Sequence, residues 1–231
     1  MLAAAAAYAE PSSREQVIAR LAGGGTDLSN LEAPGVDLSG IDFRGARVFG
    51  ANLEGANLAK ANLANCNLDI SILRNAVLTD ANLRSASLFG VLMVRANLAG
   101  ADLSGARLMS NLEFANLEGA NLSDLKSGAD MRNQPMGLIR IVLRNAKLKG
   151  AKLVGADLSR GDLSFADLRE ADLTRANLSR VKLTGADLSG ATLEGATVTD
   201  AEIHNSIFTG ARGVSSLHGL ETTHGRETAT F

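Results

Sequence analysis

Leucine recurs at every fifth position along most of this chain. Asn or Asp usually precedes it and Ala stands two positions before it, as in the Ala-Asn-Leu of residues 51–53 and the Ala-Asp-Leu of residues 101–103. A period of five matches neither the 3.6-residue period of an amphipathic helix nor the two-residue period of a strand. A short unit copied in tandem is typical of a solenoid, in which each unit buries its apolar side against its neighbours.

The repeat divides the chain into three parts. We predict an N-terminal segment with a capping helix over residues 1–25, a repeat solenoid over 26–210 and a poorly ordered C-terminal tail over 211–231. The solenoid frame slips by one residue after Leu108, and an irregular break near 123–142 precedes a new frame.

A short helix is predicted over residues 12–22. Ser12 or Ser13 can cap its N-terminus, and the three glycines of 23–25 end it. Because a solenoid needs a polar-faced cap over its first core layer, we interpret this helix as that cap. A partner-binding helix is the alternative.

Composition indicates a narrow interior and excludes several classes of protein. Aromatic residues make up only 3% of the chain and tryptophan is absent, so Leu and Ala must fill the core. A formal net charge of −2 argues against a general nucleic-acid binder, and a single cysteine excludes an internal disulfide. No apolar run approaches the roughly 18 residues that cross a bilayer. We expect a cytoplasmic protein with no membrane or nucleic-acid partner; export or an organelle lumen is the alternative, because the first nine residues are Ala-rich.

The sequence offers no catalytic or metal-binding constellation. The three histidines fall near the C-terminus without Cys or carboxylates at metal-ligand spacing, and each Asp beside a leucine belongs to the repeat itself. Cys66 takes the place of an inward Ala, so its thiol should be buried and inert. We therefore expect no enzyme activity, no cofactor and no metal.

The tandem A-[D/N]-L-x-x units over about 26–210 resemble the signature of the pentapeptide-repeat family. The resemblance implies an all-β fold, a right-handed quadrilateral β-helix with four pentapeptides in each coil and about eight or nine coils. At the strand spacing of about 4.8 Å per coil, the rod would be on the order of 40 Å long. Residues 20 positions apart would then stack in columns on its surface.

Two branches of the family bear on function. Residues 13–17 and 143–149 resemble the pentapeptide-repeat part of adaptors that carry a BTB/POZ (potassium-channel-tetramerisation) domain, although these 231 residues leave no room for that domain. That resemblance implies a substrate receptor of cullin ubiquitin ligases. The other branch protects gyrase and resembles an acidic, DNA-like dimer, which a net charge of −2 fits poorly.

Bulky apolar residues fall on outward positions of the early repeats. Phe49, Phe89 and Met109 share one predicted column, and Ile72 stacks under Leu92 on the adjoining face. Exposed apolar side chains often mark an interface. We interpret these residues as a candidate interaction surface; the alternative is that they are singly tolerated on the surface.

A run of basic residues without an intervening acid forms a second candidate, at the place where the repeat frame resets. It could bind an acidic partner or nucleic acid, and the alternative is a solvated face. The run consists of Arg132, Arg140, Arg144, Lys147, Lys149 and Lys152.

These features favour a non-enzymatic scaffold that presents flat solenoid faces to a protein partner. The sequence does not identify that partner, and a homodimer is a further alternative. The second hypothesis is a DNA-mimic inhibitor or protector of a type II topoisomerase, which predicts a dimer with an acidic longitudinal stripe.

Overall fold

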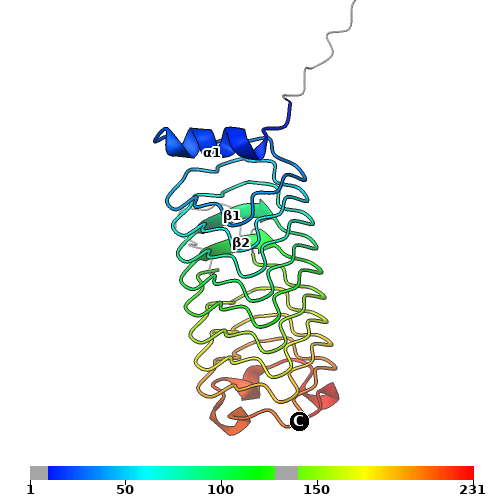
Figure 1. The fold of residues 1–231 in the computed structure, drawn as a ribbon. Coiled ribbons are helices and arrows are strands. Elements are labelled where there is room, and N and C mark those ends of the chain that lie inside the picture. The colour runs from blue at the N-terminus through cyan, green and yellow to red at the C-terminus, as the bar shows by residue number, and fades with distance from the viewer. Residues whose placement is uncertain (1–9, 128–139) are drawn as a thin grey trace, which may run out of the picture.

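The computed structural model describes residues 10–127 and 140–231 as a four-sided rod with one helix across its N-terminal end (Figure 1). Regular elements are few, because most of the chain alternates single bridge-paired residues with two-residue turns. The helices and strands are α1 (Arg14–Ala22), β1 (Ser87–Leu92), β2 (Arg107–Asn111), and the 3-10 helices η1 (Val214–Ser216), η2 (Leu220–Thr222) and η3 (Arg226–Thr228).

Parallel bridges between successive coils hold the rod together. Asp27 pairs with Arg47 and Arg47 with Asn67, so the residue before each central leucine returns to the same face after 20 positions. Four such columns run along the rod. We number the faces 1 to 4 by the first residue of each column: Asp27, Glu32, Asp37 and Asp42.

The repeat pattern follows from what each position contacts. The central leucines and the alanines two positions before them are almost all fully buried in one continuous core. The N–H of each leucine donates to the next coil, as from Leu53 to the carbonyl of Ile72 at 2.8 Å. Leucine therefore fills the interior while its backbone continues the ladder.

Asn and Asp recur before the leucine because their side chains close the turn that follows. The Oδ1 of Asn82 accepts the backbone N–H of Arg84 at 3.1 Å. Its Nδ2 donates to Oδ1 of Asn62 in the preceding coil, also at 3.1 Å. Such local side-chain bonds favour turns over regular secondary structure.

The second turn residue of nearly every repeat has a left-handed backbone, which explains the frequent glycines there. Asn and Asp also tolerate this conformation, whereas it is unusual for bulky or β-branched residues. Three bulky apolar residues nevertheless adopt it: Ile70 (φ 56), Phe114 (φ 61) and Phe165 (φ 59). Their side chains project from corners of the rod and return below.

Helix α1 covers part of the N-terminal end of the core. Ser13 caps it by accepting the N–H of Gln16 at 3.3 Å, and the Gln16 side chain accepts the Ser13 N–H at 2.8 Å. Val17 is fully buried against the first coil. The Arg14 guanidinium anchors the helix by donating to the Asp37 carbonyl at 2.8 Å.

The C-terminal residues complete a further coil, which differs from the poorly ordered tail expected over 211–231. Steps of six residues replace steps of five, and each extra residue is taken up by a 3-10 turn that follows a left-handed glycine. The ring of Phe231 stacks on that of Phe208 with a centroid distance of 5.0 Å. The bridges of this coil are Thr192 with Arg212, Thr197 with His218, Glu202 with His224, and Ile207 with Thr230.

Candidate protein-interaction surface

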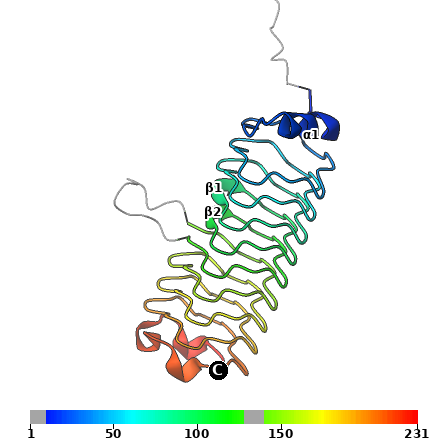
Figure 2. The ribbon, with the colours of Figure 1, turned by 60° about the vertical axis from the view of Figure 1, so that its left-hand side comes forward.

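Before the last coil, the breaks in the five-residue frame lie at one corner of the rod, between faces 1 and 2. Strands β1 and β2 cross this corner as a parallel pair, with a register shift after Phe89 (Figure 2). The four-residue step from Arg107 to Asn111 is also at this corner. The residues added after Ser127 join the same two faces, because Lys126 belongs to face 1 and Val142 to face 2.

Apolar side chains border this corner on its face 1 side. Phe49 and Phe89 are half-buried there, two coils apart. Ile70 lies between Gly50 and Gly90 of the neighbouring coils: a Cβ on Gly90 would stand 3.4 Å from its Cγ2. Ile70 is 51% exposed and was not among the residues singled out in the sequence.

Face 2 continues the apolar surface. Ile72 and Leu92 are bridge-paired in adjacent coils, and both are half-buried. Asn111 follows in the column and Val142 comes after it. The stacking of Ile72 under Leu92 is therefore as the sequence predicted.

Two exposed phenylalanines border the opposite side of face 2, at the corner with face 3. Phe114 is 49% and Phe165 is 53% exposed, with Asn145 in the coil between them. Sequence reasoning missed both, since they precede an Ala rather than a central leucine. The available signal was an aromatic residue at the turn position that Gly or Asn commonly fills.

Met109 is not part of this surface, and the prediction that it is exposed was wrong. It is 2% exposed, and its neighbour Ser110 is also buried. The four-residue step leaves this corner one residue short, so both side chains are drawn in. The Ser110 hydroxyl donates to the Leu88 carbonyl.

The basic run does not form one patch, because consecutive repeats point from different faces. Arg144 lies at the corner of faces 2 and 3, Lys147 on face 3, and Lys152 on face 4 between Asn121 and Asp172. One coil thus wraps the run around most of the rod. Arg132 lies outside the described residues.

Two members of the run are also paired with acids. Arg144 lies 4.0 Å from Glu113, and the Lys149 ammonium lies 3.4 Å from Glu170. Arg140 is exposed at the corner between faces 1 and 2. The prediction that this run forms one basic patch is therefore wrong, although Arg140 and Arg144 themselves border face 2.

Arginines lie over three of the phenylalanine rings beside face 2. Such cation–π contacts hold the guanidinium against the ring while leaving its N–H groups available. The distances from the guanidinium carbon to the ring centroid are 5.1 Å for Arg47 and Phe49, 4.9 Å for Arg107 and Phe89, and 5.7 Å for Arg95 and Phe114.

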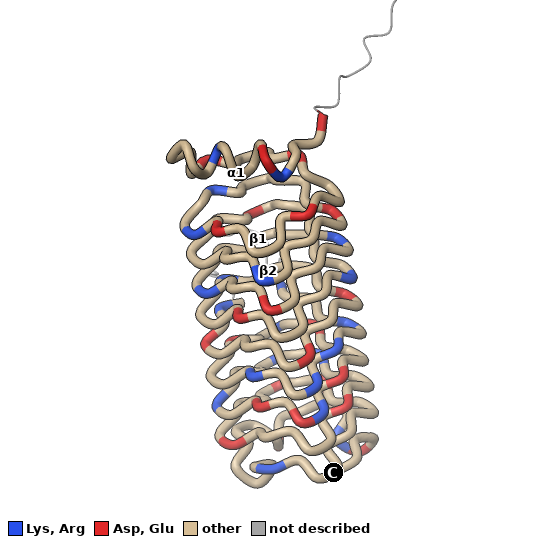
Figure 3. The backbone as a smooth tube through the Cα atoms, viewed as in Figure 1, with Lys and Arg blue, Asp and Glu red and all other residues tan. Residues whose placement is uncertain are grey.

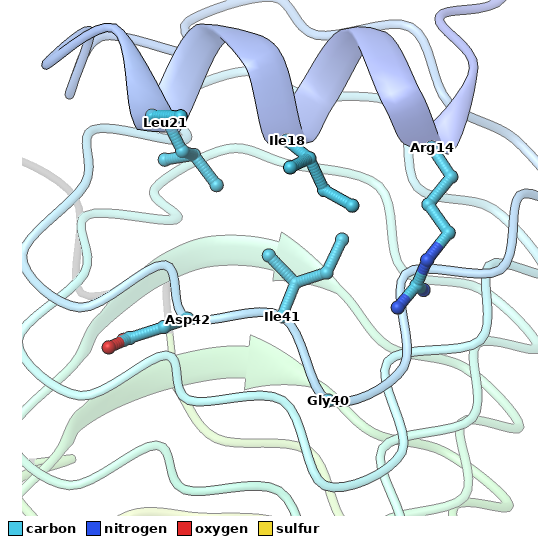
Figure 4. Close-up of a pocket in the computed structure, with 7 residues that line it drawn as sticks. Arg14, Ile18, Leu21, Gly40, Ile41 and Asp42 are labelled. Carbon is cyan, nitrogen blue, oxygen red and sulfur yellow. The ribbon is translucent and has the colours of Figure 1, made fainter.

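A cavity of about 430 Å³ lies between α1 and the first coil (Figure 4). Ile18 and Leu21 of the helix point toward Ile41, while Arg14 and Asp42 lie at its two ends. The cavity exists because a nine-residue helix covers only part of the core end. Its lining is apolar apart from Arg14 and Asp42, and the Arg14 guanidinium is already bonded to the backbone of the coil.

The polar groups of the rod are mostly engaged in its own turns. Hydrogen bonds from the Arg169 guanidinium hold the pKa of the Asp167 carboxyl below its ordinary value. Burial raises the pKa of the Cys66 thiol to about 11, and the thiol donates to the Phe43 carbonyl at 2.9 Å. Within residues 10–127 and 140–231, no three His, Cys, Asp or Glu side chains gather as a metal site, and no helix could span a bilayer.

A four-sided stack of five-residue units defines a solenoid of the β-helix class. The family model for pentapeptide repeats matches in eight copies, over residues 24–124 and 138–212. The chain therefore belongs to the pentapeptide repeat family, which confirms the family and the β-helical solenoid predicted from the sequence.

Solved structures of other pentapeptide repeat proteins are similar to this chain. HetL, involved in heterocyst differentiation regulation in the cyanobacterium Nostoc sp. strain PCC 7120, is 29% identical with a TM-score of 0.50, over 93% of this chain and 98% of HetL. Trypsin-treated QnrB1, a plasmid-mediated fluoroquinolone resistance protein, is 20% identical with a TM-score of 0.48, over 84% of this chain and 88% of QnrB1. No curated protein matches the chain.

Proposed function

We propose that this protein is a non-enzymatic interaction scaffold that binds a protein partner through face 2 and its two corners. The observation that carries the proposal is that several independent features lie on the same side of the rod. The apolar residues of the two corners, the apolar part of the face 2 column and the frame breaks that precede the last coil border the same side of the rod.

Exposure of large apolar side chains supports this choice of surface. In the described part of the chain, the three most exposed are Phe165, Ile70 and Phe114, and all three lie at the corners of face 2. The others are at the ends of the rod, in α1 and in the last two coils. Buried aromatic anchors commonly dominate binding energy at interfaces.

The rigidity of the coil also favours binding. Each repeat is hydrogen-bonded to the coil above and the coil below, so the corner side chains are held on a fixed backbone. A preorganised surface loses little conformational entropy on association.

A topoisomerase protector that mimics DNA would instead need an acidic stripe along the rod. Acidic and basic residues are interspersed on the side shown in Figure 3, and the net charge is only −2. A gyrase supercoiling assay in which this protein has no effect would remove that alternative.

Affinity capture with paired variants tests the scaffold. The test variant carries Phe89→Ser and Leu92→Ser; the control carries Val77→Ser and Ile207→Ser, two outward apolar residues of face 3. We expect a specific partner to be captured by the wild type and the control but lost from the test variant. Equal capture by all three proteins, with unchanged melting curves, would exclude face 2 as the binding surface. Light scattering on the purified proteins reports whether the partner is a second copy of this chain.

A further inference from the structure

The middle of face 2 is bordered by arginines, although the whole chain has a net charge of −2. Each of these arginines is exposed, and only Arg144 makes an ion pair among the described residues. They surround the apolar column from the coil of Ile72 to that of Phe165. The set is Arg74, Arg95, Arg107, Arg140, Arg144 and Arg160.

The carboxylates of the same region are already engaged or buried. Asp69 accepts the N–H of Phe89 at 2.8 Å and the hydroxyl of Ser87 at 2.6 Å. Glu113 is the partner of Arg144, and Asp162 is 7% exposed and accepts from Ser164. The surface therefore presents apolar groups framed by positive charge.

Paired arginine and phenylalanine side chains on this surface suit a ligand that combines a carboxylate with an apolar group. Arg107 lies over Phe89 on one side of face 2, and Arg95 lies over Phe114 on the other. The planar guanidinium binds a carboxylate with two parallel hydrogen bonds, and the ring beside it offers apolar contact. A carboxylate adjacent to an aliphatic side chain meets both needs.

The width of the apolar region indicates the shape of the partner. Its side chains form three parallel columns: one on each corner and one on the face. An extended strand turns only a single row of side chains toward a surface, whereas a helix is about 10–12 Å across with its side chains. Three columns therefore match a helix better than a strand.

We propose that face 2 binds an acidic amphipathic helix of a partner protein, laid along the rod with its apolar side on the Ile72 and Leu92 column. Its carboxylates meet the arginines of the two corners. The coils from Ile72 to Asp162 span about 19 Å at the usual strand spacing, which a helix of roughly 13 residues covers. This inference rests on the scaffold function and adds the chemistry of the partner.

Three synthetic helical peptides test it by fluorescence anisotropy. The first carries leucines on one side and glutamates on the other; the second replaces every glutamate by lysine; the third has the composition of the first in scrambled order. We expect the acidic amphipathic peptide to bind at least tenfold more tightly than either of the others. Its affinity should fall as salt rises, because exposed charges are screened.

Charge-reversal variants of the protein complement the comparison of the three peptides. Arg74→Glu combined with Arg95→Glu should lower the affinity for the acidic peptide at least tenfold and raise the affinity for the lysine peptide. The control, Lys60→Glu with Arg175→Glu, reverses two exposed charges on corners away from face 2 and should leave both affinities unchanged. Left-handed Glu170 shows that glutamate is accepted at the backbone conformation of Arg95.

Equal binding of the acidic and lysine peptides, or no binding of any peptide at millimolar concentration, would overturn the inference. An acidic peptide whose affinity is unchanged by the charge reversals at Arg74 and Arg95 would also overturn it. If capture of a partner depends on Phe89 and Leu92 while the acidic peptide fails, the scaffold function stands and the acidic helix is excluded.

Discussion

The ring of Phe165 lies against Gly185 in the following coil, and substitution of that glycine measures how firmly the ring is held. A Cβ on Gly185 would stand 2.6 Å from two ring carbons of Phe165. Gly190 is the matched control, because a Cβ there would meet nothing closer than the Glu170 Cγ at 3.8 Å. The two glycines have similar backbones, with φ of +66° and +69°.

Both Gly→Ala substitutions pay the left-handed backbone penalty, which is about 1–2 kcal/mol. Gly185→Ala must also displace the ring, and overpacking costs about 1–3 kcal/mol. Since Phe165 is 53% exposed and can swing outward, the lower end applies. We expect Gly185→Ala to be less stable than Gly190→Ala by about 1 kcal/mol, a Tm difference of about 2–4 °C for a chain of this size.

A double-mutant cycle checks the cause by thermal unfolding followed by circular dichroism. In a Phe165→Ala background the extra cost at Gly185 should vanish, and the two glycine variants should melt together. If Gly185→Ala and Gly190→Ala melt together in both backgrounds, the ring does not lie on the next coil and the reasoning fails.

Further substitutions test the core, the thiol and the cap. Leu103→Ala removes a fully buried side chain and should lower the free energy of unfolding by about 2–5 kcal/mol in urea titrations; a loss below 1 kcal/mol would contradict a close-packed interior. Cys66 should resist thiol reagents in the folded protein at pH 8 and react once the chain is unfolded. Because burial raises its pKa from 9.0 to about 11, the unfolded thiol loses its proton first. Its contribution to stability should therefore be constant below pH 9 and fall between pH 9 and 11, and Cys66→Ala should abolish that fall in pH-dependent melts. Ser13→Ala removes the helix cap and should cost about 1 kcal/mol, seen as faster hydrogen exchange at Val17; unchanged exchange would show that core contacts alone hold α1.

The solenoid could be predicted from the sequence because its determinants are local and repeated. Most repeats contain a buried Leu, a small inward Ala, and an Asn or Asp that closes its own turn. The capping helix was predictable for a similar reason, since Ser13 and Gln16 satisfy its first N–H groups within four residues.

Surface composition was harder to predict because sequence neighbours separate in space. The basic run from Arg144 to Lys152 is continuous in the chain, yet one coil turns it through three faces. Met109 would be exposed in an unbroken frame, but a missing residue at its corner buries it. The last coil was missed because its six-residue steps depend on left-handed Gly213, Gly219 and Gly225, which a five-residue template does not contain.

The corner between faces 1 and 2 shows how this fold treats a change of chain length. The chain is one residue short between Leu108 and Leu112, and it is lengthened after Ser127. Face 3 is undisturbed by either change, since Asn116 still pairs with Lys147. In a globular core such insertions and deletions would shift every later contact. Here each coil touches only its two neighbours, so the normal pairing between coils is restored within a single turn. This corner is therefore a natural grafting point, where a foreign loop can be exchanged while the leucine ladder beneath it is left as it is.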